Sequence, residues 1–291
     1  MPLQESSPGR VRWPEFSHVV FDCDSTLSTI EGIDVLAESL GFADEVASMT
    51  HAAMAGDVEL NDVYAERLRL LQPSKQAISD LRTAYKRNVV ADARAVVAGL
   101  NELGISVYVV SGGLADPVTD FATHLGIDPD HVKAVEARHD SLSGEWWKSD
   151  QGAVDQDYVG FEEGALTYST GKAEIIRTLL AGTSGLSMLV GDGASDMEAG
   201  GAVDLFVGFG GVVRRPAVAS EAPIYIKSAS LAPVLPIAVG PGGQERLRSH
   251  DAREAFAWGV DLVAAGEVDF RDDSKRDQLL AALRVEAQHR G

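Results

Sequence analysis

A short apolar run that ends in two carboxylates is the feature that most constrains how this chain folds. The run Val19-Val20-Phe21 stops at Asp22 and Asp24, with Cys23 between them. An apolar run closed by polar residues predicts a buried parallel strand, and open α/β sheets bind their ligands at the carboxyl ends of such strands. Successive strand residues point to opposite faces, so Asp22 and Asp24 lie on the same side and can converge on one ligand.

A second acidic strand end follows far downstream, where the apolar run 188–190 leads through Gly191 to Asp192 and Asp196. Four carboxylates from two strand ends are a plausible cradle for a hard cation such as Mg²⁺, with room for a phosphate. One carboxylate of the first pair can attack phosphorus, while the other, with a pKa raised by neighbouring anions, protonates the leaving oxygen. The alternative for each motif is a loop rich in helix-capping acids.

Strand and helix patterns alternate through much of the chain, which indicates the α/β class. Strands are expected at 105–111, 186–191, 204–208 and 223–227, and helices at 92–103 and 172–181, with another helix opened by Asp116 as N-cap and Pro117. Such alternation predicts a parallel sheet with helices on both faces, a Rossmann-like core.

Two regions depart from this alternation. Residues 31–90 contain helical patterns without a convincing strand, and Ser74 is a good N-cap for one of them, so we expect a helical cap whose loops fold over the first acidic turn. Helical patterns at 249–265 and 273–289 close the chain, and this tail either packs on the core or serves a dimer. The predicted domains are a core of residues 16–30 and 91–230, a helical cap of residues 31–90, and a C-terminal helical extension of residues 231–291.

Between 139 and 171, Gly144-Glu145-Trp146-Trp147 suggests a hairpin within a long surface loop.

Composition excludes several classes of function. The 291 residues are 45% hydrophobic, which is ample for a packed core, and 44 acidic against 25 basic residues give a net charge of -19. This charge argues against a nucleic-acid or anionic-membrane partner. No segment approaches the roughly 18 apolar residues of a membrane span. The single cysteine, Cys23, cannot form an internal disulfide and fits a reducing compartment, so we expect a cytoplasmic enzyme.

Two further motifs suit a phosphate group. Ser111-Gly112-Gly113 ends a predicted strand with a hydroxyl and two glycines, which let backbone N–H groups approach phosphate closely. Lys172 lies at a predicted helix N-terminus, where its charge and free N–H groups can both neutralise phosphate. The alternatives are an ordinary glycine-rich turn and a solvated surface lysine.

Two familiar catalytic loops do not fit. A P-loop needs Gly at 166 and Ser or Thr at 173, and this chain has Leu166 and Ala173. The nucleophile elbow of serine hydrolases around Ser195 needs Gly where Met197 stands. A nucleotide-binding loop and a serine hydrolase are therefore disfavoured.

The four motifs together resemble those of the haloacid dehalogenase-like phosphatases, and more narrowly those of the phosphoserine phosphatases. The likeness covers roughly residues 16 to 230. The broader match consists of Asp22-Cys23-Asp24-Ser25-Thr26, Ser111-Gly112-Gly113, Lys172 and Gly191-Asp192-Gly193-Ala194-Ser195-Asp196. The narrower match adds Glu31-Gly32-Ile33-Asp34, Met54, Gly56, Glu66-Arg67-Leu68, Leu71-Gln72-Pro73-Ser74, Met197-Glu198-Ala199 and 207–211 through Arg215.

The resemblance implies Mg²⁺-dependent hydrolysis of O-phospho-L-serine through an aspartyl-phosphate, a reaction of serine biosynthesis. It assigns Asp22 as nucleophile and Asp24 as the acid and later the base. The remaining implied roles are as follows: Asp22, the backbone carbonyl of Asp24, and Asp192 hold Mg²⁺, supported by Asp196; Ser111, Gly112, Lys172, Ser195 and Arg215 bind phosphate; Glu31, Met54 and Arg67 bind the rest of the substrate.

The resemblance leaves two alternatives open, namely another small phosphomonoester as substrate, or transfer of the phosphoryl group to a hydroxy amino acid. Leu60 and Leu114 stand where the family usually has aromatic residues that shape the pocket. The expected partner is therefore a small phosphomonoester, most specifically phosphoserine, and a homodimer is possible.

Overall fold

The structure, a computed structural model, describes residues 13–55, 60–141, 156–162, 164–168, 170–240 and 242–288. Within these ranges, the side chains of 50–55, 60–62 and 282–288 are not described.

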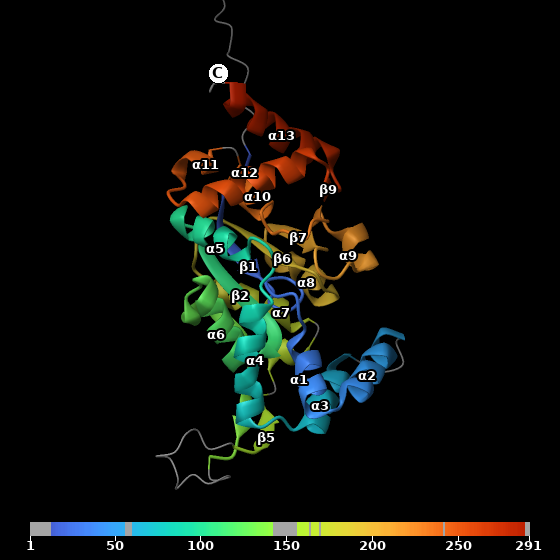
Figure 1. Ribbon diagram of the computed structural model, residues 1–291. Coiled ribbons are helices and arrows are strands. Elements are labelled where there is room, and N and C mark those ends of the chain that lie inside the picture. Colours follow the sequence, from blue (N-terminus) through green and yellow to red (C-terminus); the bar gives the residue numbers. More distant parts are fainter. Residues whose placement is uncertain are drawn as a thin grey trace, which may run out of the picture.

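A seven-stranded sheet lies at the centre of the described part of the chain (Figure 1). Its strands, in spatial order, are β3 (Val132–Val135), β2 (Ser106–Leu114), β1 (Phe16–Phe21), β6 (Leu186–Gly191), β7 (Leu205–Phe209), β8 (Ile224–Ile226) and β9 (Val268–Phe270). Neighbouring strands are parallel from β3 to β8, and β9 runs antiparallel to β8. The chain passes from β1 to β2 and β3 on one side and then crosses to β6 on the other. The strand order therefore reverses between β1 and β6, the point at which open α/β sheets bind ligands.

Helices cover both faces of the sheet, as the sequence predicts. Side chains alternate along β1, so Val19 and Phe21 join one hydrophobic cluster and Val20 joins a second cluster on the opposite face. The first cluster includes side chains of α5 (Ala93–Glu102), α6 (Ala115–Leu125), α10 (Val234–Val239) and α12 (His250–Ala264). The second includes side chains of α7 (Gly171–Leu179), α8 (Ala194–Ala199) and α9 (Pro216–Glu221). Burial on both faces explains why the strands read as continuous apolar runs.

The predicted cap forms four helices: α1 (Gly32–Leu40), α2 (Ala43–Ala55), α3 (Leu60–Leu71) and α4 (Lys75–Arg87). The chain leaves the sheet and returns to it along two adjacent segments, joined by hydrogen bonds from Thr29 N to Asn88 O at 2.8 Å and from Val90 N to Leu27 O at 2.9 Å. Ser74 caps α4, because its side chain accepts a hydrogen bond from Ala77 N. The described helices of this segment are thus one insertion after β1.

A two-stranded hairpin supports the insertion from the side. Strands β4 (Ala137–His139) and β5 (Tyr158–Phe161) pair antiparallel. The hairpin reaches the insertion through a hydrogen bond of 3.1 Å between His139 Nε2 and Pro73 O, and through an edge-to-face contact of Tyr64 with Phe161 at 5.7 Å between ring centroids. The hairpin predicted at Gly144–Trp147 lies outside the described residues.

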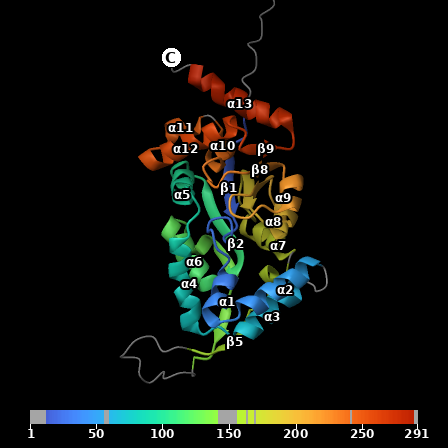
Figure 2. The same cartoon turned by 45° about the vertical axis from the view of Figure 1, so that its right-hand side comes forward.

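The C-terminal extension packs on the sheet. Helices α12 and α13 (Asp273–Gln288) match the predicted helical patterns, and α11 (Gly243–Arg246) precedes them. Strand β9, which the sequence patterns do not predict, adds the extension to the sheet beside β8. In both views α12 and α13 lie at the opposite end of the molecule from α1–α3 (Figures 1 and 2).

Three short 3-10 helices complete the described fold, at Pro129–His131, Ala165–Thr167 and Gly200–Ala202. Among the described residues, no helix has the length and apolar character that crossing a membrane requires.

Candidate active site

One cavity of about 260 Å³ opens at the carboxyl ends of β1, β2 and β6, beneath the inserted helices. Ligand pockets commonly occupy about 300–1,000 Å³, so this cavity suits a small metabolite. It collects residues from the core and from the insertion. The predicted site residues that line it are Asp22, Asp24, Glu31, Arg67, Ser111, Gly112, Lys172, Asp192, Ser195, Asp196 and Arg215. Met54 belongs to α2, and its side chain lies outside the described part of the structure.

Three buried carboxylates meet at one side of the cavity. Oxygen atoms of Asp22, Asp192 and Asp196 all lie within 4.8 Å of one another. The two strand ends that carry them are joined by a hydrogen bond of 3.0 Å from Asp22 N to Val190 O. Burial, and then the charge of Asp196, raise the pKa of Asp22, and burial is the main cause that raises the pKa of Asp192 to about 6. The cluster therefore carries more negative charge than its surroundings stabilise.

Lys172 connects two of these carboxylates. It is the second residue of α7, only 6% exposed, and its Nζ donates hydrogen bonds of 2.7 Å to Asp22 Oδ1 and to Asp196 Oδ1. Burial alone lowers the pKa of Lys172, but the attraction of Asp196 and Asp22 is stronger and leaves the pKa above its usual value. The preceding residue must be small, because a Cβ atom on Gly171 would overlap the carbonyl oxygen of Ala165.

Asp24 lines the same cavity, two residues after Asp22. Its Oδ1 accepts hydrogen bonds from the Tyr85 hydroxyl at 2.6 Å and from Gly32 N at 3.3 Å. Burial, followed by the negative charge of Glu31, raises the pKa of Asp24 to about 7. A carboxyl group with such a pKa is partly protonated near neutrality, which suits a proton donor.

The end of β2 brings the predicted phosphate loop to the cavity. Ser111 is buried, and its hydroxyl oxygen accepts a hydrogen bond of 3.0 Å from Gly113 N. Gly112 and Ser195 also line the cavity. These groups come from β2 and from the start of α8, so the fold joins motifs that are far apart in sequence.

Arg215 is not an isolated cation. Its Nε donates a hydrogen bond of 2.8 Å to Asp192 Oδ2, and its Nη2 lies 3.5 Å from Glu31 Oε1. Arg215 therefore links the acidic cluster to the insertion.

Glu31 and Arg67 project from the insertion into the same cavity. The Glu31 side chain accepts a hydrogen bond of 2.7 Å from the Ser25 hydroxyl. The Nε atom of Arg67 is buried and has no hydrogen-bond partner among the described residues, and burial lowers the pKa of the guanidinium. A buried donor without a partner is costly, so Arg67 is well suited to a ligand that accepts hydrogen bonds.

The sequence patterns miss several lining or supporting residues. Thr26 is fully buried, and its hydroxyl lies 3.4 Å from Asp192 Oδ1; its place in the first acidic motif was the available signal. Tyr64, Tyr85 and Leu166 also line the cavity. Aromatic and apolar residues at helical spacing predict core packing, so no local signal marks these three as part of a site.

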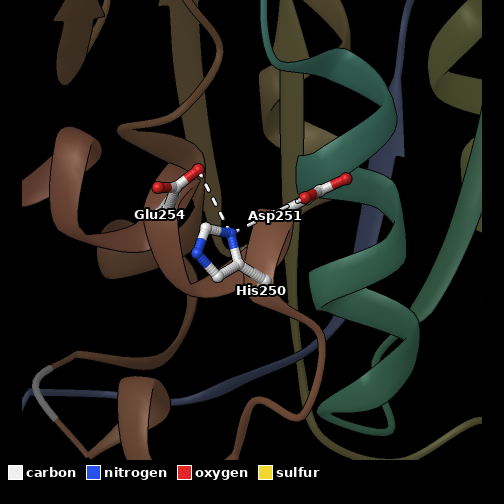
Figure 3. Close-up of side chains that lie close together, drawn as sticks. All are labelled: His250, Asp251 and Glu254. Atoms are coloured by element: carbon white, nitrogen blue, oxygen red, sulfur yellow. Dashed lines mark ion pairs between the residues drawn. The ribbon is translucent and has the colours of Figure 1, made fainter.

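A second group of possible metal ligands lies at the start of α12, where His250, Asp251 and Glu254 come together (Figure 3). The Nδ1 atom of His250 is 3.3 Å from a Glu254 oxygen and 3.9 Å from an Asp251 oxygen. All three side chains are at least 72% exposed, and none lines the cavity. Water solvates such a group, so it has no part in the site described above.

The fold and the acidic cluster define a haloacid dehalogenase-like hydrolase. A solved haloacid dehalogenase-family hydrolase from Salmonella enterica shares the fold, with a TM-score of 0.66, 17% identity, and coverage of 78% of this chain and 72% of that one. Two solved phosphoserine phosphatase structures, an analogue of the phospho-aspartyl intermediate and a substrate-bound complex, match at 25% identity. Their TM-scores are 0.61 and 0.60, with 76% of this chain and 98% and 97% of theirs covered.

Curated protein sequences identify the family within this class of hydrolases. This chain is 36% identical to the phosphoserine phosphatase of Homo sapiens over 210 residues, which cover 72% of this chain and 88% of the human protein. It is 34% identical to the chloroplastic phosphoserine phosphatase of Arabidopsis thaliana over 214 residues, 72% of this chain and 68% of that one. The scan against family models finds no match. The chain belongs to the phosphoserine phosphatase family and is a phosphoric monoester hydrolase.

Proposed function

We propose that this protein is a Mg²⁺-dependent phosphoserine phosphatase, which hydrolyses O-phospho-L-serine to L-serine and phosphate through an aspartyl-phosphate on Asp22. The observation that carries the proposal is the joining, in one cavity, of the acidic cluster and Lys172 with Glu31 and Arg67. The relatives named phosphoserine phosphatase support the same substrate.

The two residues of the insertion match the two charged ends of the amino acid. Arg67 has a planar guanidinium, which binds a carboxylate through two parallel hydrogen bonds, and its Nε has no hydrogen-bond partner within the described part of the chain. Glu31 supplies a negative charge for the substrate ammonium. Met54, from α2, is proposed to shape the pocket around the substrate.

The acidic cluster fits a hard divalent cation, because Mg²⁺ prefers carboxylate and carbonyl oxygens. We assign Asp22, the backbone carbonyl of Asp24, and Asp192 as ligands, with Asp196 in support. The raised pKa values of Asp22 and Asp192 agree with a site that needs more positive charge. When bound, the ion polarises the phosphoryl oxygens and lowers the repulsion between the phosphate and the carboxylates.

In the first step, a carboxylate oxygen of Asp22 attacks phosphorus and forms a new P–O bond. The ester P–O bond breaks, its electron pair moves to the serine oxygen, and Asp24 donates a proton to that oxygen. Serine leaves and Asp22 holds the phosphoryl group. Lys172, with Ser111, Gly112, Ser195 and Arg215, binds the phosphoryl oxygens, on which negative charge accumulates.

In the second step, water attacks the phosphorus of the aspartyl-phosphate. Asp24, now a carboxylate, takes a proton from this water, the bond between phosphorus and Asp22 breaks, and the electron pair returns to Asp22. Inorganic phosphate leaves and both aspartates return to their initial states.

We also propose that residues 31–90 act as a cap over a core of residues 16–30 and 91–230. The two adjacent connections at Thr29–Asn88 and Leu27–Val90 support this division, since they make the insertion continuous with the core at one hinge. A cap of this kind excludes water while the ester is cleaved.

The proposal is tested by metal-dependent phosphate release from phosphoserine, phosphothreonine and sugar phosphates, compared by kcat/KM. Arg67→Lys removes the planar fork but keeps the charge, so KM for phosphoserine should rise about tenfold or more. The matched control is Arg69→Lys, because Arg69 lies on the same helix, α3, but is exposed. This control should leave KM unchanged.

Two results would reject the proposal in different ways. A sugar phosphate with a higher kcat/KM than phosphoserine, together with no effect of Arg67→Lys, would identify a different phosphomonoester as substrate. Phosphate released in less than stoichiometric yield when homoserine is added would indicate a phosphotransferase.

A further inference from the structure

We propose that Tyr85 is a positioning residue for phosphoryl transfer, which fixes the carboxyl plane of Asp24 so that the transferable proton is on Oδ2 and faces the leaving oxygen. This inference rests on the proposed role of Asp24 as the acid. It concerns a residue of the insertion, on α4, that no motif of the acidic turns includes.

The hydrogen bonds to Asp24 distinguish its two oxygens. The Tyr85 hydroxyl, at 2.6 Å, and Gly32 N, at 3.3 Å, both donate to Oδ1. An oxygen that accepts two donors is the poorer place for a proton, so the acid proton is directed to Oδ2. Oδ2 faces the phosphate loop, because a Cβ atom on Gly113 would lie 3.3 Å from it.

The hydroxyl of Tyr85 is held by the core as well as by its own helix. The ring is 1% exposed and stacks on Phe121 of α6, with 5.4 Å between centroids and 25° between planes. Helix α4 is also joined to α6 by an ion pair between Arg82 and Asp116. The hydroxyl therefore has a defined position relative to the sheet that carries Asp24.

The second donor depends on the same arrangement. A Cβ atom on Gly32 would collide with the Tyr85 hydroxyl oxygen, so only glycine allows the backbone N–H and the phenol to reach Oδ1 together. The two donors thus depend on each other, although Gly32 lies at the start of the insertion and Tyr85 lies near its end.

The competing explanation is that Tyr85 is an ordinary core tyrosine whose hydroxyl found the nearest acceptor, since buried polar groups are usually hydrogen-bonded. Tyr225 shows that ring burial in this protein does not by itself bring a partner. It is also 1% exposed, and its hydroxyl has no hydrogen-bond partner among the described residues. Tyr225→Phe is therefore the matched control for Tyr85→Phe.

The test compares two phosphoryl donors through kcat/KM, which reports the steps up to departure of the leaving group. The serine oxygen needs a proton as it leaves. The leaving group of acetyl phosphate is acetate, a stable anion that needs no proton. Tyr85→Phe keeps the stacked ring and removes only the hydroxyl. We expect kcat/KM for phosphoserine to fall about tenfold, mostly in kcat, as part of the roughly 10²- to 10⁴-fold contribution of a general acid. The value for acetyl phosphate should stay within about twofold of the wild type, and Tyr225→Phe should change neither.

A double-mutant cycle completes the test. In an Asp24→Asn background, which has no transferable acid proton, Tyr85→Phe should cause no further loss with phosphoserine. Equal losses on both donors, no loss on either, or a full additional loss in the Asp24→Asn background would overturn the inference. Failure of the proposed function is separate, because wild-type enzyme would then not release phosphate from phosphoserine. In that case, the alkyl phosphomonoester that the wild type hydrolyses fastest replaces phosphoserine in the comparison with acetyl phosphate.

Discussion

Replacing Lys172 with methionine tests whether the acidic cluster is a charged site held together by one buried cation. The side chain of Lys172 is 8% exposed, and those of Asp22 and Asp196 are 10% and 1% exposed. Methionine keeps most of the apolar stem and removes the ammonium. Both carboxylates then lose their 2.7 Å partner at positions that are largely shielded from solvent.

The expected cost follows from this burial. Removing one partner of a buried ion pair destabilises a protein by roughly 3–5 kcal/mol, because an uncompensated charge is left behind. The pKa of Asp22 is already raised by burial, so the carboxylates of the variant can take up protons and recover part of the loss. We therefore expect Lys172→Met to lower the free energy of unfolding of the metal-free protein by about 3 kcal/mol at pH 8, and by less at pH 5.

Lys227→Met is the matched control. Lys227 pairs with Asp269 at 2.8 Å, nearly the same distance, but the lysine side chain is 30% exposed and the aspartate is 56% exposed. Exposed pairs of this kind contribute about 0–1 kcal/mol. The two lysines therefore differ mainly in burial.

The assay is urea unfolding in the presence of a chelator, with the midpoint read at constant m value. Saturating Mg²⁺ should return part of the stability of Lys172→Met, because it binds only the folded cluster and replaces the lost positive charge. Equal effects of the two substitutions, or no response of the variant to Mg²⁺, would show that Lys172 does not stabilise the acidic cluster as a buried cation.

Two further predictions concern the same site. The raised pKa values of Asp24, about 7, and Asp192, about 6, mean that metal-free folded protein holds protons that the unfolded chain releases near pH 4. The free energy of unfolding should therefore decrease as pH rises from about 4 through 7, by on the order of 4 kcal/mol for Asp24 alone, and Mg²⁺ should flatten this dependence. Urea unfolding at several pH values measures it, and a stability that rises over this range contradicts it. Gly171→Ala should lower kcat at least tenfold, since its Cβ would displace the turn that carries Lys172. Gly201→Ala, where a Cβ meets nothing within 4 Å, is the control, and similar kcat values for both would contradict this reasoning.

The sequence predicts the parts of this fold whose signal is local and long. Strands β1 and β6 are buried on both faces, so they read as continuous apolar runs that end at acidic turns. Strands β3 and β9 are only four and three residues long, and pairing with a neighbouring strand defines them. Strand β8 is equally short, but its three residues are all buried and apolar and predict a strand. Strands β3 and β9 each include an exposed charged residue, so their short patterns do not distinguish a strand from a loop.

Helix α6 shows the same limit at a helix end. Asp116 is predicted as its N-cap, but α6 begins at Ala115 after Leu114, and the Asp116 side chain pairs with Arg82 of α4. Capping propensity therefore gave the wrong position, and the carboxylate forms a tertiary ion pair in place of a cap. Helix ends also fray, so element boundaries commonly differ by one or two residues.

In the candidate site, motif spacing predicts the residues of the acidic turns but does not predict the residues that support them. Asp22, Lys172 and Asp192 lie at strand ends or a helix start, where topology brings them together. Tyr85 lies within α4 on its buried side, where an aromatic residue predicts core packing. Its contact with Asp24 depends on how α4 packs on α6, which no local pattern encodes.

The role of Asp22 as nucleophile is tested most directly by locating the phosphoryl group on the enzyme during turnover. Wild-type protein would be mixed with phosphoserine labelled in its phosphate group, in the presence of Mg²⁺, quenched in acid within milliseconds, digested and mapped by mass spectrometry. We expect the label on Asp22, and we expect Asp22→Asn to fold normally but to show neither label nor turnover. A label on any other residue, or phosphoserine turnover by Asp22→Asn, would contradict this role of Asp22.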